Sequence, residues 1–248
     1  AFGVYSLLMD CTATITPGTS QSAAIIQRIE GNVLRTFKDK KMVLSFWVKA
    51  TKTGTYSLAF LNGNETRTLI KEFTVLSSGV WEKKIVRFSH DSTGTWNYDT
   101  SNGMTINFTL VAGTSLQTAP DVWTNGSFRG SPNQVSGADN TANNFQLADV
   151  CLVEDNEGQT REPDFQLAGR DLFEELQLCQ RYFEKSYNVD VAPGTVTGLG
   201  GHVPSATSDA GSSLYVSAHT AFQVNKRVSP TTVPYCPATG ASNRFAVY

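Results

Sequence analysis

Two groups of aromatic and polar residues in turn-rich segments have the side-chain types that bind sugars. Sugar rings stack their C–H groups on flat aromatic faces, and their hydroxyls pair with amides and carboxylates. The first group is Trp96, Tyr98, Asp99 and Asn102, and the second is Trp123, Asn125, Phe128 and Arg129. We expect a carbohydrate platform at one or both groups. The alternative is that these aromatic side chains pin long loops to a sheet or pack on a neighbouring subunit.

Residues that could perform catalysis do not form a recognisable set. Asp91, Asp99, Asp121 and Asp139 are spread over turn-rich segments, and no spacing singles out the pair that a glycosidase needs. Acidic residues in turns commonly bond to their own backbone. The chain contains no GxSxG, HExxH or P-loop motif. We therefore predict no enzyme activity and no cofactor, and the sequence singles out no metal ligands.

The charge distribution disfavours two classes of partner. The 248 residues carry a net charge of −2, and only 17% of them are charged, against about 25% in an average domain. Acids and bases are scattered without a basic stripe, so we expect no nucleic-acid binding. No apolar run approaches the roughly 20 residues of a membrane helix, so we expect no membrane insertion. Strand-like residues at both ends of the sequence suggest a chain that is cut from something longer or processed.

The four cysteines have no metal-binding spacing. They are Cys11, Cys151, Cys179 and Cys236, and none of them forms a CxxC pair. Free thiols are the expectation for a protein made in a reducing cytosol. The alternative is a disulfide between Cys11 and Cys151, which requires the first and last strands of one sheet to pair.

The first 155 residues alternate between apolar and polar side chains in short runs. Residues 104–110 alternate without a fault, with Thr105, Asn107 and Thr109 opposite the apolar row. This period of two predicts a sheet with one buried face and one face in water. Further apolar rows are Leu44, Phe46 and Val48; Tyr56, Leu58 and Phe60; Val86 and Phe88; and residues 145–153.

Turn residues separate these rows at short intervals. Residues 52–54 and 62–64 have the composition of hairpin turns. Strands at this spacing predict a β-sandwich or jelly roll. The segment from Ala112 to Asn144 is rich in Gly, Ser, Asn and Pro, and a loop of this length is usually functional or mobile.

One segment, residues 171–185, has helical periodicity, and Asp171 with Glu174 indicates its N-terminal cap. We expect its apolar stripe to serve a domain junction or a subunit interface. The stripe consists of Leu172, Phe173, Leu176, Cys179, Tyr182 and Phe183. After Tyr187, β-like stretches at 189–191, 213–216, 221–224 and 231–235 predict a second, smaller β domain. The predicted division is therefore a jelly roll at 1–160, a link and helix at 161–186, and a small, possibly incomplete β domain at 187–248.

Several stretches resemble bacteriophage tail-fibre and minor structural proteins. Three consecutive stretches occur in the same order as in that family: the strand 145–154, the link at 162–165 and the helix 174–185. The helix contains the run Cys179-Gln180-Arg181-Tyr182. Residues 44–50 followed by 54–57 resemble the central hairpin of the family's carbohydrate-binding-module-like jelly roll, and residues 222–231 resemble the β segment after the helix. The resemblance covers most of the chain, and the Cys-Gln-Arg-Tyr helix is its most specific element.

The resemblance implies a structural or adhesive component of the virion surface, in a tail or head fibre. It implies a homo-oligomer, with a trimer favoured, that contacts other virion proteins and host surface glycans. A structural Ca²⁺ is compatible with the implied fold, because such modules often hold one through oxygen ligands. Two alternatives stay open: a capsid decoration or head-fibre protein that binds only virion proteins, and a carbohydrate-binding module of a secreted bacterial hydrolase.

Overall fold

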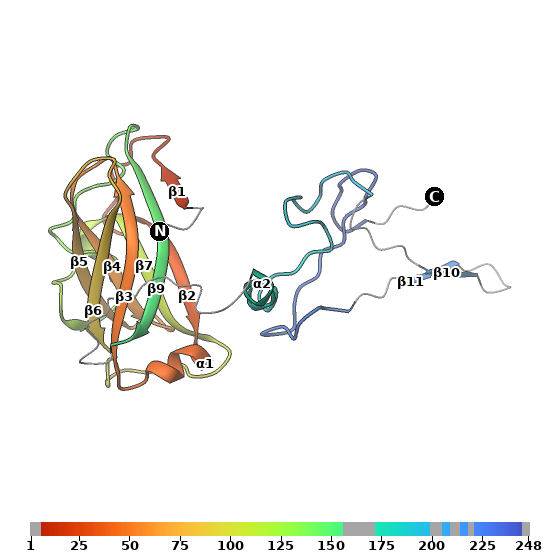
Figure 1. Cartoon of the computed structure of the whole chain (residues 1–248), viewed down its shortest axis with the longest axis horizontal. Helices are drawn as coiled ribbons and strands as arrows, with labels where there is room; N and C mark the ends of the chain where they lie inside the picture. Colours follow the sequence, from red (N-terminus) through yellow and green to blue (C-terminus); the bar gives the residue numbers. More distant parts are fainter. Residues whose placement is uncertain (1–5, 156–171, 199–204, 209–213, 218–220, 245–248) are drawn as a thin grey trace. The chain divides into compact units, whose positions relative to one another are not determined.

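The computed structural model describes residues 6–155, 172–198, 205–208, 214–217 and 221–244 (Figure 1). The chain forms two compact units, Ala1–Gln166 (unit 1) and Leu167–Tyr248 (unit 2). Strands predominate in unit 1 and helices are short, so the prediction of a mainly β fold is confirmed.

Unit 1 is a sandwich of two antiparallel sheets (Figure 1). The four-stranded sheet has the order β1 (Leu7–Asp10), β9 (Asn144–Glu154), β3 (Lys41–Ala50) and β6 (Glu82–Ser89). The five-stranded sheet has the order β2 (Ser22–Glu30), β7 (Asn102–Ala112), β4 (Gly54–Asn62), β5 (Arg67–Val75) and β8 (Trp123–Asn125). Three short helical segments, α1 (Gly31–Leu34), η1 (Arg35–Phe37) and η2 (Thr114–Leu116), lie in the connections.

The chain crosses between the two sheets repeatedly, as in a jelly roll. The hairpin predicted at residues 62–64 is confirmed, because β4 and β5 pair antiparallel across it. The hairpin predicted at residues 52–54 is wrong. β3 and β4 belong to different sheets, so this turn is a connection between sheets rather than between paired strands.

Aromatic side chains from both sheets fill the space between them. Phe46 of β3 meets Phe73 of β5 and Phe108 of β7 edge to face, at centroid distances of 5.1 and 5.2 Å. Phe60 of β4 packs on Phe88 of β6 at 3.9 Å. The apolar rows that alternate in the sequence supply this core, because every second residue of a strand points to the same face.

The opposite face of the five-stranded sheet is buried as well, which corrects the prediction of a face in water. Thr105, Asn107 and Thr109 are only 1–2% exposed. The segment 113–143, which we call the outer-face loop, folds back over them, and the Thr109 hydroxyl donates to the Arg129 carbonyl at 2.6 Å. The backbone N–H of Ser131 donates to the Ser57 hydroxyl at 3.0 Å. The long polar loop therefore forms a third layer on this sheet.

Strands β1 and β9 pair, as a disulfide between Cys11 and Cys151 requires, but the register keeps the two thiols apart. Asp10 lies opposite Asn144, and the N–H of Cys11 bonds to the carbonyl of Asn143. Cys151 lies several residues further along β9, opposite Ser45 of β3. All four cysteines are free, as expected.

Unit 2 contains less regular structure than predicted. Its helix α2 spans Leu172–Gln180, and the chain turns at 181–182, so the predicted extension to residue 185 is wrong. The strands β10 (Ser205–Ser208) and β11 (Leu214–Ser217) form one hairpin. Residues 189–191, 221–224 and 231–235 are not strands, apart from an isolated bridge between Tyr235 and Ser242. Short runs of Val and Thr favour extended backbone, but a sheet forms only where a neighbouring strand supplies the hydrogen bonds.

Candidate functional site

The structure brings together three of the four aromatic residues of the two predicted sugar-binding groups, Trp96, Tyr98 and Trp123. The Trp96 and Trp123 rings meet edge to face with centroids 5.6 Å apart. His90 packs on Trp96 at 4.6 Å, and the Tyr98 hydroxyl lies 3.2 Å from His90 Nε2. These four side chains, which we call the aromatic cluster, gather where β6, the β6–β7 connection and β8 meet.

Both indole N–H groups in the aromatic cluster donate to backbone carbonyls. Trp96 Nε1 donates to Thr93 at 3.0 Å, and Trp123 Nε1 donates to Ser89 at 3.1 Å. β6 and β8 are edge strands of different sheets. The bond from Trp123 to Ser89 therefore joins the two sheets at one edge of the sandwich, so the loop-pinning alternative describes part of what these side chains do.

Burial sets the protonation state within the aromatic cluster. Desolvation lowers the pKa of His90, and the nearby carboxylates of Asp39 and Asp91 offset part of that effect. Desolvation also raises the pKa of the Tyr98 phenol, and Asp39 adds to the increase. Burial therefore favours the neutral forms of both side chains.

A buried ion pair anchors the start of the β6–β7 connection. Asp91 accepts from Arg67 at 2.6 Å, and the two side chains are 8% and 14% exposed. The same carboxylate accepts from the backbone N–H and the hydroxyl of Thr93 at 3.0 and 2.8 Å. Burial opposes ionisation of Asp91, but the bonds from Arg67 and Thr93 outweigh it and hold the pKa below the ordinary value. Arg67 also donates to Asn125 at 2.8 Å, which ties β8 to the same anchor.

A hollow of about 470 Å³ opens beside Trp123 at the edge of the sandwich. Its volume falls within the range of small-ligand sites, about 300–1,000 Å³. β5 and β6 supply most of the wall. The rest comes from the start of β3, from β8 and the turn before it, and from the residue after β9. This sheet-edge hollow is lined by Lys41, Leu69, Lys71, Arg87, Phe88, Ser89, Asp121, Trp123 and Asp155.

Two ion pairs lie on the wall of the sheet-edge hollow. Lys71 bonds to Asp121 at 2.6 Å, and Arg87 lies 3.4 Å from Asp155. The Asp121 backbone adopts a φ of 68°, a left-handed conformation that is uncommon outside glycine, while its N–H donates to Ile70 at 2.8 Å. The Asp121 side chain remains 67% exposed, so its carboxylate can accept hydrogen bonds from a ligand.

Of the eight residues in the two predicted groups, only Trp123 lines the sheet-edge hollow. Trp96 and Tyr98 belong to the aromatic cluster, and the other five have different partners. Asp99 accepts from the N–H and hydroxyl of Ser101, and Asn102 donates to Thr105. Asn125 accepts from Arg67. Phe128 packs on Ala59, Leu61 and Ile70, and Arg129 forms an ion pair with Glu65 at 2.5 Å. These five side chains fix turns and the outer-face loop.

Sequence reasoning missed most of the charged residues that line the sheet-edge hollow. Lys41, Lys71 and Arg87 lie in or at the ends of alternating strands, where a charged residue usually indicates a solvated position. Asp155 directly follows β9. Only Asp121 carried a local signal, because it follows Pro120 and precedes Trp123 by two residues in a turn-rich segment. The pairing of β5 with β8 brings Lys71 near Asp121, and the pairing of β3 with β6 and β9 brings the other three together. No local pattern encodes these pairings.

The predicted interface residues on α2 lie at the surface of unit 2. Phe173, Tyr182 and Phe183 are 59–65% exposed, and Leu176 is 37% exposed. Cys179 is also exposed. The side chain of Leu172 is outside the described residues. Most of the apolar stripe is therefore exposed on unit 2 taken by itself.

Neither a metal-binding cluster nor a membrane-spanning helix is found among the described residues. No cluster of three or more His, Cys, Asp or Glu among them could hold a metal ion. None of the helices in the described ranges has the length and apolarity to cross a lipid bilayer. Comparison of the chain with protein-family models, curated proteins and solved structures found no match.

Proposed function

We propose that this chain is a non-enzymatic, carbohydrate-binding structural protein of a phage particle, and that the sheet-edge hollow holds the sugar. The observation that carries the sugar-binding proposal is the combination, in one hollow, of an aromatic wall at Trp123 with an exposed carboxylate at Asp121 and the ammonium of Lys71. Aromatic surface and paired polar groups are the two features that sugar recognition requires.

The geometry of the hollow favours binding over catalysis. Glycosidases hold two carboxyl groups across one cleft, one of them protonated. In the sheet-edge hollow, each carboxylate is already paired with a cation: Asp121 with Lys71, and Asp155 with Arg87. On this proposal, each carboxylate is held in place by its cation and accepts hydrogen bonds from the hydroxyls of the sugar.

A sequence resemblance supports the assignment to a phage particle. The 145–185 region and the β segments on either side of it resemble phage tail-fibre and minor structural proteins. The jelly-roll arrangement of unit 1 agrees with the domain that the resemblance implies. On this proposal, unit 1 contacts a glycan on the host surface, and unit 2 connects the chain to the particle.

A glycan array probed with the full chain tests the sugar-binding proposal, followed by calorimetric titration of the best ligand. Asp121→Asn removes the charge while asparagine still tolerates the left-handed backbone. A hydrogen bond to a charged group contributes about 1.5–3 kcal/mol, so we expect binding about 10- to 100-fold weaker.

The matched control is Asp139→Asn. Asp139 pairs with Lys52 on the surface of the same unit, and neither residue lines the hollow. We expect the control to bind within about twofold of the unmodified chain, because an exposed pair outside the site contributes little. An array without any ligand would overturn the sugar-binding proposal, as would an Asp121→Asn variant that binds as tightly as the control.

A further inference from the structure

The sheet-edge hollow is lined by more basic than acidic side chains. Among the described residues, the basic ones are Lys41, Lys71 and Arg87, and the acidic ones are Asp121 and Asp155. The ion pair of Lys40 with Glu154, next to Lys41 and Asp155 in the sequence, is neutral and leaves this balance unchanged. The wall of the hollow therefore carries one excess positive charge, although the whole chain has a net charge of −2.

Arg87 has hydrogen-bonding capacity that the described part of the chain does not use. Its Nε lies 3.4 Å from Asp155 Oδ2, beyond the usual N–H···O distance of about 2.7–3.2 Å. The side chain is 57% exposed and makes no hydrogen bond to another described residue. Lys71, in contrast, is only 23% exposed and bonds to Asp121 at 2.6 Å. A guanidinium is a planar fork of N–H donors that matches the two oxygens of a carboxylate.

The two sheets supply different chemical groups to the hollow. In β6, Phe88 belongs to the core between the sheets, so the neighbouring Arg87 points to the outer face of the four-stranded sheet. Trp123 and Asp121 come from the five-stranded sheet, in β8 and in the turn before it. A ligand in the hollow therefore meets a basic fork on one side, and an aromatic ring with an exposed carboxylate on the other.

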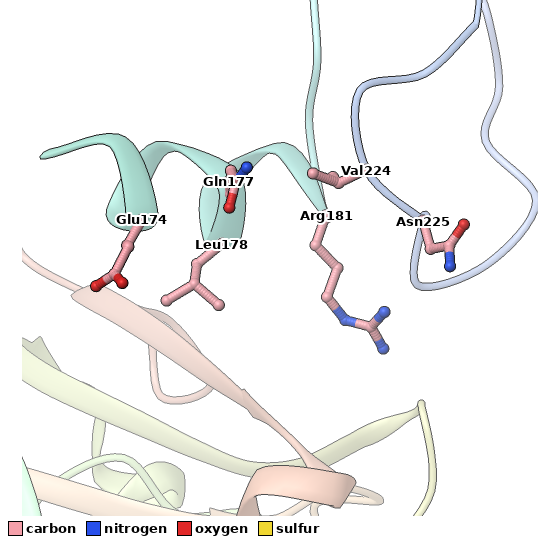
Figure 2. A pocket seen from close by; sticks show the side chains of 6 residues that line it. All are labelled: Glu174, Gln177, Leu178, Arg181, Val224 and Asn225. Carbon is pink, nitrogen blue, oxygen red and sulfur yellow. The ribbon is translucent and has the colours of Figure 1, made fainter. Parts of the chain in front are cut away.

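The hollow beside α2 in unit 2 lacks this combination. It has a volume of about 480 Å³, and Figure 2 shows Glu174, Leu178 and Arg181 pointing to the same side of the helix. Its lining contains one acid, one base and no aromatic side chain. Neither an excess charge nor a stacking surface indicates a charged sugar there.

We infer that the sheet-edge hollow binds a sugar that carries a carboxylate, such as a uronic acid, and that Arg87 determines this specificity. The guanidinium donates to both carboxylate oxygens, the sugar ring stacks on Trp123, and its hydroxyls donate to Asp121. A carboxylate brings a single negative charge, which matches the excess charge of the wall, whereas a phosphate monoester brings about −1.5 to −2. The inference rests on the proposed sugar-binding function and adds the class of sugar.

A glycan array with acidic, neutral and phosphate-bearing glycans, probed with the full chain, tests the class of sugar. Calorimetric titration then compares the best acidic glycan with its carboxyl-reduced form, which keeps the ring but loses the charge. We expect the acidic form to bind at least about tenfold more tightly. We also expect added salt to weaken the binding of the acidic form and to leave that of the reduced form unchanged, because salt screens exposed charges.

Arg87→Gln tests the residue that determines the specificity. We expect its affinity for the acidic glycan to fall about 10- to 100-fold, and its affinity for the reduced form to change by less than about threefold. The matched control is Arg28→Gln, which removes the same charge from β2 and does not line the hollow. Both arginines are exposed, so neither replacement should unfold unit 1.

Three outcomes overturn this inference while the sugar-binding proposal stands. They are a reduced form that binds as tightly as the acid, a phosphate-bearing glycan that binds more tightly than every carboxylate-bearing one, and equal affinities of Arg87→Gln and Arg28→Gln for the acidic glycan. An array without any ligand overturns the inference and the sugar-binding proposal together.

Discussion

Replacing Asp91 with alanine removes one partner of the buried ion pair that anchors the β6–β7 connection. The single carboxylate accepts bonds from Arg67 and Thr93. Removal of one partner of a buried pair costs about 3–5 kcal/mol, because the other charge is left without compensation. Arg67 keeps its bond to Asn125, so we expect the lower end of this range, about 3 kcal/mol.

Tryptophan fluorescence during thermal or urea unfolding measures this loss. Trp47, Trp81, Trp96 and Trp123 all lie in unit 1, so the signal reports on the sandwich alone. For a domain of this size, 1 kcal/mol shifts the midpoint by about 2–4 °C, so a loss of about 3 kcal/mol corresponds to a decrease of about 6–12 °C. Asp139→Ala, which breaks an exposed pair, is expected to lower the stability by less than about 1 kcal/mol.

A double-mutant cycle with Arg67→Ala separates the pair from its surroundings. We expect the two single variants to be non-additive by about 1.5–3 kcal/mol, as for residues that share one buried network. A coupling energy below about 0.5 kcal/mol would refute the reasoning, because Asp91 would then stabilise the loop through Thr93 rather than through the ion pair.

Two further predictions concern pH and backbone packing. Burial opposes ionisation of Asp91 and Glu65, yet their hydrogen-bonding partners hold both folded pKa values below the ordinary ones. The two carboxylates therefore stabilise the fold above their ordinary pKa values, and this contribution is lost as the pH falls through the folded pKa values. We expect the urea midpoint of unfolding to decline from about pH 5 downward, and to decline less in the Asp91→Ala variant. Gly63→Ala places a methyl 1.8 Å from the Asn102 carbonyl oxygen and should cost about 3 kcal/mol in urea unfolding. In Gly79→Ala the added methyl meets no atom within 4 Å, so only the φ of 69° is unfavourable and the loss of stability should be about 1 kcal/mol. Equal losses of stability in the two variants would contradict this prediction.

The strands of unit 1 were predictable because their periodicity is a local property. Residues 104–110 form the middle of β7, and Phe46 and Phe108 lie in the core as their rows indicate. The environment of the opposite face was not predictable. Small polar residues such as Thr109 alternate in the same way whether water or another segment covers them, and here the outer-face loop covers them.

The candidate site was predictable only in part, for a related reason. Trp96 and Trp123 were singled out by type and by their turn-rich surroundings, but their contact depends on the pairing of β8 with β5. The length of α2 was overestimated because the apolar stripe continues past the point where the backbone leaves the helix. The Arg181 carbonyl there accepts from the N–H of Arg227, a residue distant in sequence.

The pairing of β3 on both its sides has a consequence for biosynthesis. β6 follows β3 closely in the sequence, whereas β9, whose Cys151 lies opposite Ser45, is synthesised much later. At about 5–20 residues per second, a ribosome takes roughly 6–23 s to extend the chain from the start of β3 to the end of β9. During that interval one edge of β3 has unpaired backbone groups next to a large apolar surface, and it can pair with strands of other nascent chains. Slow folding of such long-range pairings makes the yield of soluble protein sensitive to expression rate and temperature.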